Sequence, residues 1–210
     1  KTTMDSAFGT ISEYQLPDGS HVTLNANSNI SISKDWKEGK DREVWLEGEA
    51  FFKVQKTAVK DRFIVLTKNM DIIVTGTQFN VISRDDESSV LLTEGSVIMK
   101  TKEGKEVPMK SGDFAVMQNK VPAIQTADQE RILAWKQSRL YFDKTPMKEL
   151  AKIIARHYGV KVTIDDESIE EKTISGLMPN NNLDVLIQAV EATGDYKITR
   201  FGKEITISNP

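Results

Sequence analysis

The fold is decided by two stretches: Leu-Glu-Gly-Glu-Ala-Phe-Phe-Lys-Val at residues 46–54 and Val-Thr-Gly-Thr-Gln-Phe-Asn-Val at residues 74–81. In each, a glycine (Gly48 or Gly76) stands a few residues before a Phe-x-Val pair. Side chains two positions apart share one face of a strand, so each pair is expected to point into a core. The glycine permits the positive φ that a tight corner or a bulge demands. The pattern therefore predicts strands that turn a corner and then bury an apolar pair.

The same pattern recurs more loosely along the first half of the chain. Gly95 and Gly112 each precede a short apolar segment, and Pro17-Asp18-Gly19 has the composition of a β-turn. Apolar residues at even positions indicate strand alternation: Val22, Leu24, Ala26, Ile30, Ile32, Val44, Leu46, Ala50, Phe52 and Val54. We therefore expect an all-β body, either solenoid-like or a sandwich of short strands. Its structural turns are predicted at Gly19, Gly48, Gly76, Gly95 and Gly112.

The periodicity changes near residue 128, where helical spacing appears. Thr145-Pro146 is expected to open a helix that Gly159 closes, with Thr145 as N-cap, and Asn182 is expected to cap a second helix that Gly194 stops. Short strands are expected before and after each helix. The order is β-α-β followed by β-α-β-β, which predicts a small α+β module. We expect an all-β domain over residues 1–130, a connector over 126–138 and the α+β module over 138–210.

Composition excludes several classes of function. The 210 residues carry 28 basic and 31 acidic side chains, a net charge of −3, so no electrostatic footprint for nucleic acid or an anionic membrane is present. No run of 18 apolar residues and no signal peptide occurs, so the chain as given is expected to be soluble. The absence of cysteine excludes disulfides and thiolate metal sites. The first residues, Lys-Thr-Thr-Met-Asp, suggest a fragment trimmed from something longer.

Residues that could carry catalysis are few, and we expect no enzyme, no metal and no cofactor. His21 and His157 are the two histidines, and each is expected to be a surface or half-buried side chain. No H-x-H metal pair and no G-x-S-x-G elbow occurs. The tetrapeptide Asp-Asp-Glu-Ser stands at residues 85–88 and again at 165–168; we interpret both as solvated acidic turns, with Ca²⁺ binding as the alternative.

The ordered motifs resemble the periplasmic region of FecR-type transmembrane anti-sigma regulators. Members of that family read L-P-D-G-[ST]-x-V-x-L-N, then G-E-A-[FY]-F-x-V, then G-T-x-F-N-V, then W-K before a short C-terminal module. Here these blocks stand at residues 16–25, 48–54, 76–81 and 135–136, and the resemblance covers nearly the whole chain. The tract from Phe142 to Leu150 and the segment from Tyr158 to Val162 are similar to the secretin/TonB short N-terminal type module that Bacteroidetes members carry at this place.

The resemblance implies a signalling role and a periplasmic location. In such a regulator, a cytoplasmic segment holds an extracytoplasmic-function sigma factor, one span crosses the inner membrane, and the periplasmic region receives a signal from the N-terminal domain of an outer-membrane TonB-dependent transducer. The cytoplasmic segment and the span have no counterpart in these residues. Sigma-factor binding is therefore not expected of this chain, and the expected partner is the transducer's signalling domain.

Partner recognition is predicted on the C-terminal module, at the strand formed by Thr173, Ile174, Ser175, Gly176 and Leu177. That strand is short and contains a glycine, which favours an open sheet edge, with an ordinary central strand as the alternative. A periplasmic carbohydrate-binding or adhesion module remains the rival function. It would require an exposed aromatic platform, for which Trp36, Trp45 and Trp135 are the candidates.

Overall fold

The computed structural model describes residues 1–33, 36–37, 39–84, 87–194 and 196–210. It divides into two compact units. The β unit comprises residues 1–6 and 11–129, and the α/β unit comprises residues 7–10 and 130–210. Residues 7–10 lie with the α/β unit although they stand near the start of the chain, a placement that no sequence pattern indicates.

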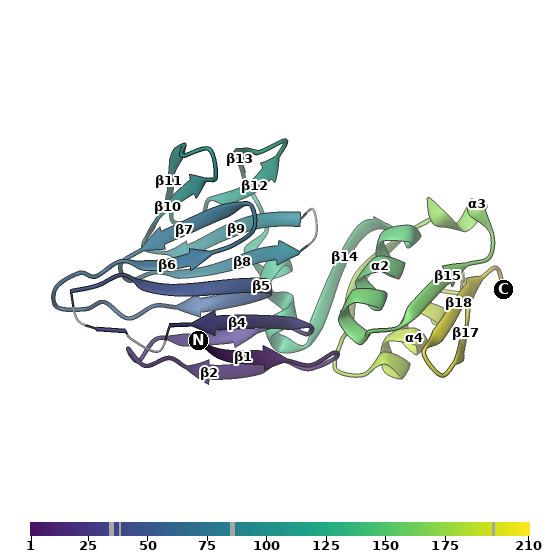
Figure 1. The fold of residues 1–210 in the computed structure, drawn as a ribbon. Helices are drawn as coiled ribbons and strands as arrows, with labels where there is room; N and C mark the ends of the chain where they lie inside the picture. The colour runs from purple at the N-terminus through teal and green to yellow at the C-terminus, as the bar shows by residue number, and fades with distance from the viewer. Residues whose placement is uncertain (34–35, 38, 85–86, 195) are drawn as a thin grey trace. The chain divides into compact units, whose positions relative to one another are not determined.

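The β unit consists of two sheets that share one long strand, β5 (Arg42–Lys53) (Figure 1). The first sheet has the order β1-β4-β5-β6-β7-β10-β11, with β1 at Thr2–Ser6, β4 at Ser28–Ile32, β6 at Phe63–Leu66, β7 at Met70–Val74, β10 at Ser96–Thr101 and β11 at Glu106–Lys110. The second has the order β2-β3-β5-β8-β9-β12-β13, with β2 at Ser12–Gln15, β3 at His21–Leu24, β8 at Gln78–Arg84, β9 at Glu87–Glu94, β12 at Phe114–Gln118 and β13 at Val121–Gln125. Only the β5–β6 pair among these described strands is parallel.

Strand β5 passes from one sheet to the other at Gly48. Its first half pairs with β4 and β6, and its second half, from Gly48 onward, pairs with β3 and β8. Gly48 has φ +110°, and a Cβ there would lie 2.6 Å from the Cα of Ser28. A side chain would therefore force two backbones apart. The corner predicted at this glycine is confirmed, and it is the place where the two sheets join.

One apolar core fills the space between the sheets. The predicted inward residues at even positions are all buried, and so are both Phe-x-Val pairs, Phe52 with Val54 and Phe79 with Val81. Phe52 stacks on Phe79 with ring centroids 5.2 Å apart, so the two sequence blocks that carry these pairs meet in the core. The all-β prediction is confirmed, and the two sheets form one near-barrel arrangement through β5.

Gly76 does not behave as predicted. Gly19, Gly48, Gly95 and Gly112 have φ between +80° and +110°, as expected of turn glycines, but Gly76 does not have a positive φ. It lies in the bend between β7 and β8, and a Cβ there would meet the aliphatic side chain of Lys56 rather than backbone. The expectation of a left-handed conformation at Gly76 is therefore wrong.

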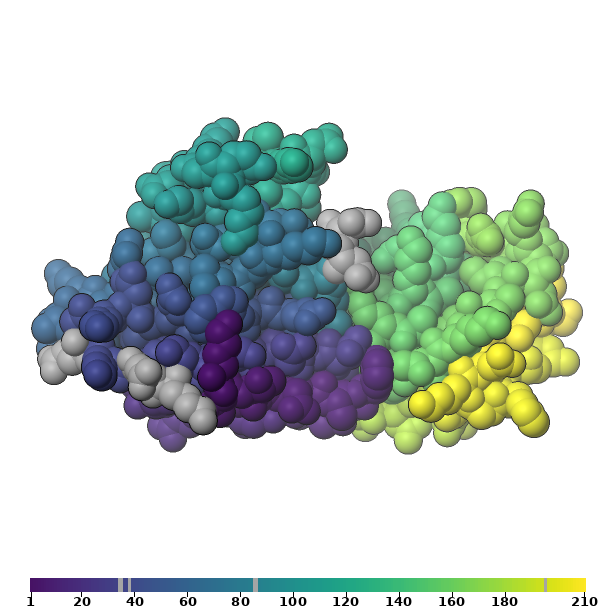
Figure 2. Space-filling model, viewed as in Figure 1, coloured from purple at the N-terminus to yellow at the C-terminus, as the bar shows by residue number. Residues whose placement is uncertain are grey.

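The α/β unit follows a short helical segment, α1 (Gln129–Leu133) and the 3-10 helix η1 (Ala134–Gln137). Strand β14 (Arg139–Pro146) pairs antiparallel with β16 (Thr173–Pro179), while β15 (Lys161–Ile164), β18 (Glu204–Ser208) and β17 (Lys197–Phe201) form a separate sheet. Helices α2 (Met147–Tyr158) and α4 (Leu183–Glu191) contribute Leu150, Ile154, Leu186 and Val190 to its core. The β17–β18 hairpin lies at the surface, where its yellow atoms are visible in Figure 2.

Two helix boundaries differ from the sequence interpretation. Thr145 does not cap α2; it still pairs with Ile174 within β14, its hydroxyl accepts from the Asp143 amide, and the helix begins one residue after Pro146. The acidic segment at 165–168 is not a plain turn, because Asp166 caps a one-turn helix, α3 (Glu167–Glu170), by accepting from the Ser168 amide. The predicted Asn182 cap and Gly159 terminus are confirmed.

The structure predicts different costs for adding a methyl group at the two motif glycines. Gly48→Ala should destabilise the protein by more than about 2 kcal/mol, because it combines a strained φ with a backbone clash. Gly76→Ala should change the stability by less than about 1 kcal/mol, because only the Lys56 side chain has to move and the unfolded chain becomes stiffer. Thermal and urea unfolding of the two variants measure the difference. Equal losses in both variants would contradict the sheet-switching role of Gly48.

Candidate functional site

The predicted partner-binding strand, β16, belongs to a sheet of two strands. Among the described residues it pairs with β14 alone, so one of its edges has no strand partner. Two-stranded sheets are marginal by themselves and are stabilised when a further strand or a helix covers them. Here the inner face packs on the core of the α/β unit through Phe142, Ile174 and Met178. The structure therefore supports the open-edge alternative for this strand over a central position.

The outer face of the β14–β16 sheet exposes an apolar pair. Tyr141 and Leu177 lie directly opposite each other in the register, and Leu177 is 51% exposed. The Arg131 guanidinium carbon lies 5.7 Å from the centre of the Tyr141 ring and 3.7 Å separates an Arg131 nitrogen from an Asp143 carboxylate oxygen. An aromatic and an aliphatic side chain bordered by charges is the composition of an interface core with a polar rim.

The five predicted partner-binding residues have different environments on β16. Thr173, Ser175, Gly176 and Leu177 are exposed, whereas Ile174 points into the core. The Ser175 hydroxyl accepts from the Lys144 amide at 2.8 Å, across the irregularity in β14 between Phe142 and Thr145. Gly176 has φ +135° and no atom within 4 Å of where its Cβ would be. Their role in partner binding stays a prediction.

Tyr141 was missed in the sequence interpretation of this site. The alternation Leu140-Tyr141-Phe142 places the tyrosine on the opposite face from Phe142, which is buried. That signal was present in the sequence. Recognising the pair with Leu177 additionally required the register between β14 and β16, which sequence spacing does not supply.

Apart from the β14–β16 sheet, a polar cluster in the β unit joins residues of the three N-terminal motif blocks. Asn25 and Asn80 donate to the two carboxylate oxygens of Glu49, at 2.8 and 3.0 Å. The Glu49 amide donates to the Ser28 hydroxyl at 3.0 Å, and the Arg84 guanidinium donates to that hydroxyl and to the Ala26 carbonyl oxygen. The cluster surrounds the β5 corner at Gly48. Its groups bond mainly to one another and to backbone, which is the arrangement of a structural corner.

Glu49 is the carboxylic acid at the centre of this polar cluster. Burial raises the pKa of its carboxyl group, and the hydrogen bonds from Asn25 and Asn80 and the charge of Arg84 offset part of that rise. Asn80 Oδ1 is buried and has no hydrogen-bond partner among the described residues.

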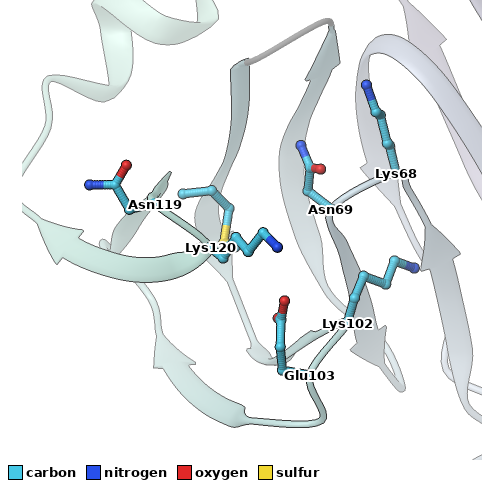
Figure 3. A pocket seen from close by; sticks show the side chains of 7 residues that line it. Lys68, Asn69, Lys102, Glu103, Asn119 and Lys120 are labelled. Atoms are coloured by element: carbon cyan, nitrogen blue, oxygen red, sulfur yellow. The ribbon is translucent and has the colours of Figure 1, made fainter.

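A hollow of about 380 Å³ lies where three hairpin turns of the β unit meet. Figure 3 shows side chains of Lys68 and Asn69 from the β6–β7 turn, Lys102 and Glu103 from the β10–β11 turn, and Asn119 and Lys120 from the β12–β13 turn around it. Lys102 forms an ion pair with Asp71. No aromatic residue is among the described residues that line the hollow. It therefore lacks the flat stacking surface on which sugar-binding modules depend.

The remaining candidates are mainly structural residues. His21 is exposed, but His157 is buried at the end of α2 against Tyr158, so the expectation of a surface or half-buried side chain is wrong for His157. Trp135 is buried, Trp36 packs edge-on against Phe63, and Trp45 is half-buried with the Lys1 amino group 3.4 Å from its ring centre. Asp85 and Asp86 lie outside the described residues. Within the described residues no group of three or more potential metal ligands occurs.

The fold combines an all-β unit with a small α/β unit, an arrangement that is found in a known family. Comparison with known families matches residues 2–98 to the FecR protein family and residues 139–207 to the FecR C-terminal family. The chain thus belongs to the FecR family, whose members are anti-sigma regulators of signalling. The resemblance seen in the sequence motifs is confirmed.

Solved structures agree with this assignment. A crystal structure of a candidate anti-sigma factor from Parabacteroides distasonis at 1.65 Å resolution superposes with a TM-score of 0.83 and 25% identity, over the whole of both chains. A second structure with the same description, at 2.50 Å resolution, matches with the same TM-score and identity over the whole of this chain and 99% of the other. No curated protein matches the chain significantly.

The raised pKa of Glu49 predicts a specific pH dependence of stability. A carboxyl group whose pKa is higher in the folded than in the unfolded state contributes stability at low pH that is lost as the pH rises through the folded value. Glu49→Gln should abolish this loss and make the protein at least as stable as the parent at pH 7. Chemical unfolding at pH 4 to 8 measures it. Glu47→Gln, at an exposed position of the same strand, is the control, and a parallel change in both variants would contradict the assignment.

Proposed function

We propose that this chain is the periplasmic sensor region of an anti-sigma regulator that receives a signal from the N-terminal signalling domain of an outer-membrane TonB-dependent transducer. The regulator relays that signal to an extracytoplasmic-function sigma factor. Membership of the FecR family supports this proposal, because the family is one of anti-sigma regulators. The proposal assigns no catalytic step to these residues.

The observation that carries the proposal is the unpaired edge of β16 beside the exposed Tyr141–Leu177 pair. A partner domain that adds a strand to this edge would gain main-chain hydrogen bonds, and its neighbouring side chains would cover the apolar pair. An added strand would also extend a sheet that has only two strands. Ser175 and Gly176 would lie at the centre of the added strand pairing.

Sigma-factor binding is assigned to a cytoplasmic segment outside these residues, joined through a membrane span. Within the part of the chain that the structure describes, no helix is long and apolar enough to cross a membrane. The proposed mechanism therefore requires the transducer contact to alter the periplasmic region first, before any change reaches the sigma factor.

The rival carbohydrate-binding function has weaker support. Two of the three tryptophans pack in the interior or against the core, and the hollow between the hairpin turns has no aromatic residue among its described lining residues. Trp45 and Trp36, which lines a hollow of about 280 Å³ with Asp18 and Arg42, are the candidates for a sugar contact. Glycan binding that Trp45→Ala abolishes would favour the rival function.

Binding of the signalling domain of the genomically adjacent transducer tests the proposal. We expect measurable affinity by calorimetry, with Leu177→Ala weakening it about tenfold, as for an apolar side chain at an interface centre. Ser175→Pro should also weaken binding, because proline removes an amide donor from the edge strand. Circular dichroism establishes that each variant is folded.

Val121→Ala is the matched control, because Val121 is 52% exposed and lies on β13 in the β unit. It should retain the parent affinity. Full affinity in folded Leu177→Ala and Ser175→Pro would move the interface elsewhere. Absence of binding in the parent chain would refute the receptor relay.

A further inference from the structure

Residues Ala7–Thr10 form a short excursion between two strands of the β unit. The chain leaves that unit after Ser6, at the end of β1, and rejoins it at Ile11, before β2. Strands β1 and β2 do not pair with each other but with β4 and β3. The excursion is therefore not the turn of a hairpin. It forms its own turn, with the Thr10 amide donating to the Ala7 carbonyl oxygen at 3.2 Å and Gly9 at φ +69°.

The excursion docks on the C-terminal end of α2 through two aromatic–glycine dipeptides. The ring of Phe8 lies over Gly159, where an added Cβ would be 2.8 Å from the Phe8 Cγ and Cδ2 atoms. In turn, a Cβ on Gly9 would lie 3.3 Å from Cδ1 of Tyr158. The absence of a side chain at Gly159 thus makes room for the Phe8 ring, and the absence of one at Gly9 makes room for the Tyr158 ring. Both also have positive φ, so each is suited to its position for two independent reasons.

The docked segment also completes the end of α2. The last carbonyl groups of a helix have no partner within the helix and need donors from elsewhere. The Gly159 amide donates to the Ala155 carbonyl oxygen at 2.9 Å, and the Gly9 amide donates to the His157 carbonyl oxygen at 2.7 Å. A residue from the first ten positions therefore supplies part of the termination of a helix that ends at residue 158.

A buried asparagine connects this helix end to the β14–β16 sheet. The Tyr158 hydroxyl donates to Asn180 Oδ1 at 2.8 Å, and burial raises the pKa of that hydroxyl to about 12, so it remains a donor at neutral pH. Asn180 Nδ2 lies 3.4 Å from His157 Nδ1, and the Asn180 amide donates to the Ser138 carbonyl oxygen at 2.7 Å. Asn180 directly follows β16, and Ser138 directly precedes β14.

We propose that Ala7–Thr10 is a latch whose docking on α2 is coupled, through Tyr158 and Asn180, to the β14–β16 sheet. The contacts of the latch with α2 include the Gly9–His157 backbone hydrogen bond and the contacts of the Phe8 and Tyr158 rings, and Phe8 remains 53% exposed. Ordering of the β14–β16 sheet fixes Asn180, and a fixed Asn180 holds the helix end that the latch contacts. By linkage, ordering of the sheet favours latch docking by the same free energy by which latch docking favours the ordered sheet.

Through this coupling, binding at the proposed partner site would affect residues Ala7–Thr10. A domain that adds a strand to β16 stabilises the sheet, tightens the latch and so restrains the chain next to β1. This partner-dependent half rests on the proposed function. The coupling between Asn180 and the latch does not, because it depends only on contacts within the chain.

Hydrogen exchange of the Gly9 amide, followed by NMR on the 210-residue chain, tests the latch. In the parent, this amide should be protected, since it donates to His157. Phe8→Ala should accelerate its exchange at least tenfold, while Val59→Ala, which truncates an equally exposed side chain in the β unit, should leave it unchanged. An unprotected Gly9 amide in the parent would refute docking.

Tyr158→Phe tests the coupling, because it keeps the ring against Gly9 but removes the hydroxyl that reaches Asn180. Loss of one hydrogen bond should accelerate Gly9 exchange about fivefold. Thr193→Val is the matched control, since it removes a hydroxyl that donates at 2.8 Å to the Val190 carbonyl oxygen in the same unit. Unchanged Gly9 exchange in folded Tyr158→Phe would refute the coupling.

Addition of the transducer's signalling domain tests the partner-dependent half. Saturating amounts of that domain should slow Gly9 exchange about threefold or more. By reciprocity, removing the latch contact with Phe8→Ala should weaken binding of the domain by the same factor. Binding with unchanged Gly9 exchange would refute the link to the partner site. Absence of binding would refute the proposed function, while the Phe8 and Tyr158 results would still decide whether the latch exists.

Discussion

The close approach of Gly48 to Ser28 is the constraint on which the β unit depends. Gly48 stands at an inward-facing position of β5, between Leu46 in one sheet and Ala50 in the other. Ser28 occupies the space that a side chain would need. The segment that runs from β3 to β4 changes sheet at the same place, since β3 pairs with the second half of β5 and β4 pairs with the first half. Strand β5 and the β3–β4 segment therefore pass between the two sheets side by side, and one core is shared by both sheets.

This corner explains what the motif blocks are for. Asn25 ends the first block, Glu49 follows the glycine of the second, and Asn80 lies in the third; the structure joins their side chains around the corner. Asp18 acts in the same way at the first turn, where it accepts from the Ser20 amide and pairs with Arg42. Polar residues that look like a functional signature thus close the fold by satisfying backbone and carboxylate groups that would otherwise be buried unpaired.

The sequence predicted much of the fold because local patterns determine much of it. Period-two alternation identified the buried residues of β3, β4 and β5, and cap residues such as Asn182 and Gly159 marked the helix ends. Two of the failures have the same cause, which is contact with distant residues. Thr145 stays in a strand because Ile174 pairs with it, and His157 is buried because the chain around Asn180 covers it. The site followed the same rule: β16 was recognisable from spacing, but Tyr141 became part of it only through the register with Leu177.

Glycine has two distinct uses in this chain, and sequence alone does not separate them. At Gly112 and Gly104 a Cβ would meet no atom within 4 Å, so the residue is needed for its φ alone. At Gly48 and Gly159 the φ is also positive, but the space is filled by another part of the chain, Ser28 in one case and Phe8 in the other. A glycine such as Gly48 or Gly159 is therefore required by a contact with a distant segment of the chain. Gly159, at the exit of α2, is of this kind, because the ring of Phe8 occupies the space that its side chain would need.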